Sequence, residues 1–251
     1  PGLANKVGAR NAAVVALTFP STPLSARRGS TVVTGLPLRA AIASLASSRK
    51  DAAGAAQARR EAAERLGVNP EAPTLLVTGG SLGALHVNES MTGAADALPE
   101  GAQVVHLTGR GKDEPVRAAV EAAGCSDRWH VIDYLTTMED ALAVADLVVC
   151  RSGAGTVAEM EALGLPCIYV PLPIGNGEQR LNAADHVAAG GAQLIDDKDF
   201  TADFVRSNVF PLLGSARLAD MAAASQSLGR AGAARALADL ALEQVKESGH
   251  E

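Results

Sequence analysis

The chain has 251 residues, of which 47% are hydrophobic and 20% are charged, and its formal net charge is −6. This length and composition predict one large globular domain, or one domain with a piece of another. The negative charge argues against a nucleic-acid partner, which needs a basic surface, and no apolar run reaches the roughly 18–20 residues of a membrane span.

The chain begins PGLANK without a Met, so we expect either a processed protein or a fragment of a longer one. Residues 1–38 contain a helix-like piece at 3–10, a short strand at 13–17 and a connection rich in Pro, Gly and Ser. This is too little to form a core alone. Residues 39–66 are rich in Ala and Arg and are predicted to be helical, with a surface break at SSRKDAAG.

From residue 74 onward, short apolar runs alternate with amphipathic stretches. The runs are rich in Val, Leu and Ile without alternation, as expected of parallel strands buried on both faces. Strands are predicted at 74–78, 103–107, 129–132, 146–150, 167–170 and 192–195. Helices are predicted at 83–97, 113–123, 137–144, 156–163 and 178–189. Repeated βα units of this size predict an α/β fold with a doubly wound parallel sheet.

Residues 200–248 are predicted to be all-helical, and the amphipathic last helix is expected to pack against whatever precedes residue 39. The three cysteines, Cys125, Cys150 and Cys167, form no CxxC pair and have no metal-ligand spacing. We therefore expect no metal site, and thiols that are reduced in a cytosolic setting.

Three glycine-rich loops follow predicted strands: TGGSLGA at 78–84, CRSGAG at 150–155 and PLPIGNGEQ at 171–179. Ligands of open α/β sheets bind beyond the carboxyl ends of the strands, where these loops lie. Glycine lets the backbone approach a ligand closely, and a helix that starts after such a loop offers free N–H groups to phosphate. Two such helix starts on one edge predict a diphosphate or sugar-nucleotide site.

The first loop also resembles the TGxxxGxG turn of short-chain dehydrogenases, which are of similar length. Those enzymes need a Tyr-x-x-x-Lys pair, but Tyr134 and Tyr169 are followed four residues later by Met138 and Pro173. The acidic residue that would bind the ribose of a dinucleotide, about 20 residues further on, is also missing. The dehydrogenase interpretation is therefore disfavoured, and no cofactor is expected.

GGSLG also matches G-x-S-x-G, the nucleophile elbow of α/β-hydrolases. A catalytic order of Ser81, Asp146 and His186 can be drawn from the sequence. However, His186 falls inside a helical pattern, no oxyanion stretch is present, and too few strands precede the serine. The hydrolase interpretation is disfavoured for these reasons.

Glu159 has two interpretations. In TVAE, Thr156 and Glu159 form a Ser/Thr-x-x-Glu capping box at the start of a helix. Alternatively, a carboxylate one turn into a helix at the ligand edge accepts hydrogen bonds from the two vicinal hydroxyls of a ribose. Spacing alone favours the cap.

The third loop places Glu178, Gln179 and Asn182 in the first turns of a helix, and their side chains suit either sugar hydroxyls or a solvated helix start. DDKD at 196–199 contains a D-x-D, the metal–diphosphate motif of some glycosyltransferases. Because FTADF follows it, capping of the next helix is the favoured interpretation.

Together, PGLANK, TGLPLR, GGSLGALHVN, VVCRSGAGTVAE, LGLPCIYVPLP and GNGEQRLNA resemble, in order and spacing, the later two-thirds of the MurG family. GNGEQRLNA resembles the actinobacterial branch. The family transfers N-acetylglucosamine (GlcNAc) from UDP-GlcNAc to a lipid-linked muramoyl-pentapeptide. The resemblance implies the donor-binding half of a two-domain GT-B architecture, whose UDP-sugar lies between two Rossmann-like halves.

Carried over by position, the resemblance implies that Arg39 contacts the nucleotide and that the backbone of Leu135 reads the uracil edge. It implies that Glu159 binds the ribose hydroxyls, so ribose binding becomes the favoured interpretation of this residue. Gly80 and Ser81 are expected to reach the diphosphate region.

The same resemblance implies that Ala154, Gly155 and Thr156 meet the phosphate and the sugar through backbone groups. Glu178 and Gln179 are expected at the GlcNAc hydroxyls. Many relatives have Gln where this chain has Glu178, and Asn where it has Leu36; the first change puts a charge near the sugar.

The family's N-terminal domain carries a GGTGGH loop, the acceptor site, the catalytic base and a membrane-binding patch, and none of these is in this sequence. We therefore expect residues 1–38 to be a remnant of that domain, 39–230 to be the UDP-sugar-binding domain and 231–251 to be a helix packing back toward the remnant. No catalytic residue is expected in the chain. The family's location is cytoplasmic and peripheral on the inner face of the cell membrane.

The resemblance implies an inverting N-acetylglucosaminyltransferase of peptidoglycan synthesis, with this chain binding the donor. The acceptor would contact the missing domain. Two alternatives are kept: a fragment that binds UDP-GlcNAc without turnover, and a UDP-sugar epimerase of the same fold.

Overall fold

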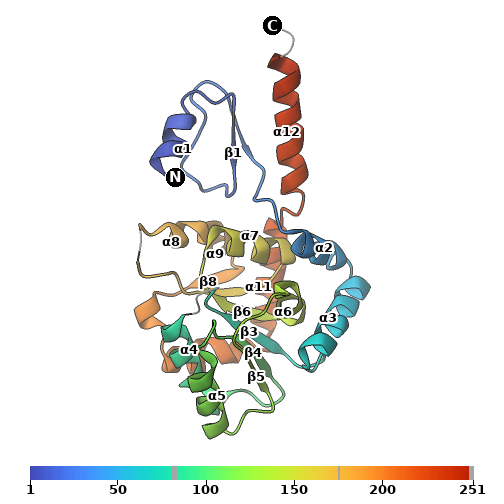
Figure 1. Cartoon of the computed structure of the whole chain (residues 1–251), viewed down its shortest axis with the longest axis vertical. Helices are drawn as coiled ribbons and strands as arrows, with labels where there is room; N and C mark the ends of the chain where they lie inside the picture. Colours follow the sequence, from blue (N-terminus) through green and yellow to red (C-terminus); the bar gives the residue numbers. More distant parts are fainter. Residues whose placement is uncertain (81–83, 175, 249–251) are drawn as a thin grey trace.

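The computed structural model describes residues 1–80, 84–174 and 176–248. Its centre is a parallel six-stranded sheet in the order β5-β4-β3-β6-β7-β8 (Figure 1). Because the strand order reverses on the two sides of β3, the sheet has the Rossmann-like arrangement. The strands are β3 (Thr74–Thr78), β4 (Gln103–Leu107), β5 (Trp129–Ile132), β6 (Leu147–Cys150), β7 (Cys167–Tyr169) and β8 (Ala192–Leu194).

The central strands are buried on both faces. Along β3, Leu75 and Val77 face one hydrophobic core and Leu76 faces the other, and all three side chains are fully buried. Each strand lies parallel to its neighbours, with Leu75 opposite Val104 of β4 and Leu147 of β6. The six strands predicted in this region and the α/β class are confirmed.

Helices cover both faces of the sheet (Figure 1). One layer includes α2, α3, α6 and α7, and the other includes α4, α5 and α11. The α-helices are α1 (Leu3–Gly8), α2 (Ala40–Ser48), α3 (Ala52–Leu66), α4 (Leu85–Thr92), α5 (Asp113–Ala122), α6 (Met138–Val144), α7 (Ala154–Leu163), α8 (Glu178–Asn182), α9 (Ala184–Ala188), α10 (Ala202–Phe204), α11 (Ala216–Leu228) and α12 (Ala233–Ser248).

Short helical turns complete the chain, and two predicted helices are corrected. The turns are η1 (Ala95–Ala97), η2 (Asp197–Asp199), the π-helical η3 (Val205–Val209) and η4 (Phe210–Leu212). The predicted helix at 83–97 ends at Thr92, whose Oγ1 donates back to the carbonyl of Asn88 (2.9 Å) just before Gly93. The predicted helix at 178–189 is two short helices that meet at Ala183.

The N-terminal residues form a small body apart from the main sheet (Figure 1). Strand β1 (Val14–Leu17) pairs in parallel with β2 (Ser30–Val33), and α12 lies beside them across a groove that Val33 and Leu240 help to line. Sequence patterning did not predict β2, because none of its four residues is buried. No helix among the described residues is long and apolar enough to cross a membrane.

Asp51 stabilises the start of α3. Its Oδ1 accepts a hydrogen bond from the amide of Gly54 (2.8 Å), one of the N–H groups that a helix start leaves without a partner. We predict that Asp51→Ala lowers the free energy of unfolding by about 1 kcal/mol in urea titration. Exposed Lys50, the preceding residue, provides the control: Lys50→Ala should change this value much less. Equal effects of the two variants would contradict the capping role.

Candidate functional site

A cavity of about 240 Å³ lies at the carboxyl ends of the central strands. The last residues of three neighbouring strands, Thr78, Leu107 and Cys150, form part of its wall, as the position of ligand sites in open α/β sheets predicts. Its other lining residues come from loops and helices around this edge: Arg39, Gly80, Gly109, Asp133, Tyr134, Leu135, Met138, Val148, Arg151, Thr156, Glu159 and Met160.

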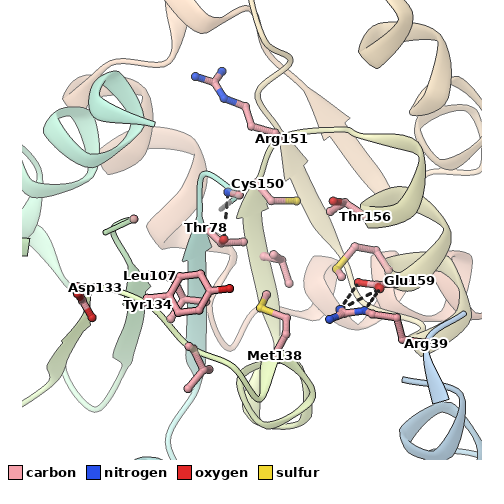
Figure 2. A pocket seen from close by; sticks show the side chains of 15 residues that line it. Arg39, Thr78, Leu107, Asp133, Tyr134, Met138, Cys150, Arg151, Thr156 and Glu159 are labelled. Atoms are coloured by element: carbon pink, nitrogen blue, oxygen red, sulfur yellow. Dashed lines mark hydrogen bonds and ion pairs between the residues drawn. The ribbon is translucent and has the colours of Figure 1, made fainter. Parts of the chain in front are cut away.

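Arg39 and Glu159 meet in this cavity although they are 120 positions apart in the sequence (Figure 2). Arg39 directly precedes α2, and Glu159 lies on α7. The guanidinium donates from Nε to Oε1 (3.0 Å) and from Nη2 to Oε2 (3.2 Å), which is a bidentate pair. The hydrogen bond to Glu159 raises the pKa of Arg39 above its ordinary value.

The predicted capping box at Thr156 and Glu159 is wrong. Helix α7 begins two residues earlier than predicted, at Ala154, and its N-cap is Gly153, with no side chain bonded to the helix start. Thr156 is therefore already helical, and Glu159 is directed to Arg39 instead of back to the helix start.

The start of α7 offers three backbone donors that have no partner within the helix. The first intrahelical bond runs from the amide of Val157 to the carbonyl of Gly153 (3.0 Å). The amides of Ala154, Gly155 and Thr156 precede this bond, so they have no partner within the helix. Such N–H groups, with the helix dipole, favour an anion at this position.

Two other residues predicted to contact the nucleotide also lie at this cavity. Gly80 and Leu135 line the same cavity as Arg39 and Glu159, and Leu135 also packs against the hydrophobic core beneath it. Gly80 has a φ of +83°, a conformation that favours glycine. Ser81 lies outside the described residues.

Glu178 and Gln179 line a second cavity, of about 360 Å³, between α8 and the loops after β7 and β8. Gln179 Oε1 accepts a hydrogen bond from the amide of Leu172 (2.9 Å), whereas the side chain of Glu178 is exposed. Asn182 lines neither of these two cavities, because its Nδ2 donates to the carbonyl of Ser152 (3.0 Å) and joins α8 to the loop before α7. The structure thus separates Asn182 from the other two predicted sugar-binding residues.

The structure excludes the hydrolase arrangement. Asp146 precedes β6 at the opposite edge of the sheet and is held by Arg59 through two hydrogen bonds of 2.9 Å. His186 is fully buried between Tyr169 (2.9 Å) and Ser225 (2.7 Å), and this burial lowers its pKa to about 4. The two groups therefore cannot act on a common serine.

Sequence reasoning missed two residues at this edge. Arg151 lines the first cavity directly after β6, and its position inside CRSGAG, a loop already selected for phosphate, was an available signal. Tyr134 also lines the cavity, and the guanidinium of Arg110 lies 4.0 Å from the centre of its ring. That contact joins loops from two strands, so no local pattern predicted it.

Residues 74–237 match the family model described as the glycosyltransferase family 28 C-terminal domain. The chain belongs to glycosyltransferase family 28. The matched range contains the whole six-stranded sheet and the helix that carries Glu159. Arg39 lies before it and reaches the family 28 domain through its ion pair with Glu159.

Two curated relatives of this family 28 chain share the name UDP-N-acetylglucosamine--N-acetylmuramyl-(pentapeptide) pyrophosphoryl-undecaprenol N-acetylglucosamine transferase. The protein from Bifidobacterium adolescentis is 48% identical over 84% of this chain and 57% of its own length. The protein from Paenarthrobacter aurescens is 46% identical over 97% of this chain and 62% of its own length. The chain thus spans less than two-thirds of either relative.

The crystal structure of Acinetobacter baumannii MurG is similar to the family 28 chain with a TM-score of 0.74 and 25% sequence identity. The similarity covers 96% of this chain and 63% of that protein. It therefore includes the small N-terminal body as well as the family 28 domain, and it confirms the resemblance to the MurG family.

Proposed function

We propose that this chain binds UDP-GlcNAc and supplies the donor half of an N-acetylglucosaminyltransferase that acts on a lipid-linked muramoyl-pentapeptide. The observation that carries the proposal is the cavity that joins Arg39, Leu135 and Glu159 beside the first backbone amides of α7, which have no partner within the helix. The names of the two relatives support this donor and acceptor. The part of these relatives that this chain does not span, more than a third of their length, is the expected place of the acceptor site and the catalytic base.

The geometry supports an assignment of the parts of the donor. At about 240 Å³ the first cavity is smaller than the ~300–1,000 Å³ of typical ligand pockets, so it suits the base and ribose rather than the whole donor. Glu159 would accept hydrogen bonds from the ribose hydroxyls, and the backbone of Leu135 would meet the uracil edge. The diphosphate would lie outside the first cavity, at the amides of Ala154, Gly155 and Thr156. Gly80 and Ser81 would also contact it.

The sugar would extend toward α8, where Gln179 and Glu178 line the second cavity. In the transfer, a hydroxyl of the acceptor attacks the anomeric carbon from the opposite face and gives its proton to the catalytic base expected outside this chain, while the bond to the UDP oxygen breaks. The negative charge that develops on the leaving diphosphate would be stabilised by the start of α7. The acceptor and the membrane surface would contact the part of the protein outside this chain, which would place the enzyme peripherally on the cytoplasmic face of the membrane.

We propose the domain division expected from the sequence: residues 1–38 with the other half, 39–230 as the donor domain and 231–251 as a returning helix. Two features support it. A parallel pair such as β1 and β2 is normally part of a larger sheet with both faces covered, and here the pair stands apart (Figure 1). In addition, α12 runs beside this pair and away from the main sheet.

Titration calorimetry with UDP and with UDP-GlcNAc tests the proposal. We predict that the purified chain binds both. Failure to bind either nucleotide, with the fold verified by circular dichroism, would contradict the proposal. A parallel assay with a lipid-linked acceptor separates the transferase half from a site with its own turnover: we expect no GlcNAc transfer by this chain alone.

A further inference from the structure

The DDKD segment at 196–199 has three acidic residues, and the first two each form an ion pair with an arginine. Asp197 forms an ion pair with Arg151, and Asp196 forms one with Arg180 on α8. The described residues contain no group of three or more His, Cys, Asp or Glu that could hold a metal ion. The acids at this edge are therefore positioned for structural ion pairs.

The Arg151–Asp197 pair is largely shielded from water, with side-chain exposures of 14% and 16%, whereas Arg180 and Asp196 are about half exposed. Shielding matters because exposed ion pairs contribute little. Arg151 also donates from Nη1 to the carbonyls of Val170 (2.9 Å) and Pro171 (3.1 Å). One guanidinium thus ties the ends of three neighbouring strands: β6, which precedes Arg151, β7, which precedes Val170, and β8, which precedes Asp197.

These contacts reach the second cavity through the backbone. Pro171, whose carbonyl Arg151 holds, directly precedes Leu172, whose amide donates to Gln179 Oε1 (2.9 Å). The orientation of the Gln179 side chain therefore depends on the backbone that Arg151 fixes. Arg151 also lines the nucleotide cavity, but Figure 2 shows its guanidinium directed away from the Arg39–Glu159 pair.

We propose that Asp197 is a positioning residue for the sugar end of the donor, acting through Arg151 on the backbone at 171–172 and hence on Gln179. The proposal rests on the function proposed above, because it takes the second cavity as the sugar subsite. It predicts a defect that falls mainly on the sugar: the Arg151 guanidinium is directed away from the Arg39–Glu159 pair, so the affinity for UDP should depend much less on Asp197 than the affinity for UDP-GlcNAc does.

The test compares the affinities for UDP and UDP-GlcNAc by calorimetry in Asp197→Ala, Asp197→Asn and a control, Asp199→Ala. Asp199 belongs to the same turn, is exposed and carries the same charge. We expect Asp197→Ala to weaken UDP-GlcNAc binding by about tenfold, equivalent to about 1.4 kcal/mol, and to change UDP binding by less than about twofold. Asp197→Asn keeps one acceptor oxygen for Arg151, so its loss should be smaller, and Asp199→Ala should leave both affinities unchanged.

Unchanged UDP-GlcNAc affinity in Asp197→Ala would overturn the proposal, and so would equal losses for UDP and UDP-GlcNAc, which would indicate a general disturbance of the fold. Hydrogen exchange of the unliganded proteins gives a second readout: the Leu172 amide should exchange faster in Asp197→Ala than in Asp199→Ala, and equal rates would also overturn the proposal. Failure of the wild-type chain to bind either nucleotide is a different result, and it would contradict both the proposed function and this inference.

Discussion

Replacing Glu159 by alanine is expected to weaken UDP binding by about 1–3 kcal/mol, the range for hydrogen bonds to a charged group in which the partner is left unpaired. The proposed function assigns the ribose hydroxyls to the carboxylate of Glu159, which lines the first cavity. Its two oxygens already accept from Arg39, and each has a further lone pair available for a ribose. The alanine variant removes these acceptors and also leaves the Arg39 guanidinium without its partner.

Calorimetry with UDP measures this effect, and Glu159→Gln separates charge from geometry, because glutamine keeps one acceptor oxygen and should lose less affinity. Glu121→Ala on α5 is a matched control, since Glu121 is also helical but exposed and outside both cavities. A folded Glu159→Ala protein that binds UDP as tightly as the wild type would show that the ribose is held by another group.

The main sheet could be predicted because its strands are buried on both faces, which leaves an apolar run such as Leu75–Val77 in the sequence. The exposed strand β2 leaves no such run and was missed. Helix ends were less predictable: Thr92 bonds back to Asn88 and α4 ends there, although the sequence continues with alanines that favour a helix.

The sequence predicted which loops form the site, but not which side chains pair within it. Strand ends in a parallel sheet share an edge, so GG and GAG loops after two strands indicate one binding edge. Local spacing, however, assigned Glu159 to a cap three residues away, whereas the fold gives it Arg39 from a segment 120 positions earlier. The ion pair of Arg151 with Asp197 spans 46 positions and had no local signature either.

The second large effect concerns Glu161, which lies on α7 two residues after Glu159 and is only 9% exposed. Its Oε1 has no hydrogen-bond partner among the described residues. Burial, assisted by the negative charge of Asp185 and opposed by Arg230, raises the pKa of Glu161 from 4.5 to about 7. Below pH 4.5 the carboxyl is mostly protonated in both the folded and the unfolded chain, so its ionisation does not change the free energy of unfolding. As the pH rises from 4.5 to 7, the unfolded chain loses this proton first, so the folded state is progressively destabilised.

We therefore predict that Glu161→Gln raises the free energy of unfolding at pH 8 by up to about 3 kcal/mol, since each pKa unit corresponds to about 1.4 kcal/mol, and has little effect at pH 4.5. Urea titrations of both proteins at the two pH values measure the difference. The buried histidines, whose pKa values are lowered, are common to both proteins, so their titration cancels in the comparison. Glu121→Gln should show no such pH dependence, and a stabilisation by Glu161→Gln of equal size at pH 4.5 and pH 8 would mean that the gain does not come from the ionisation of Glu161.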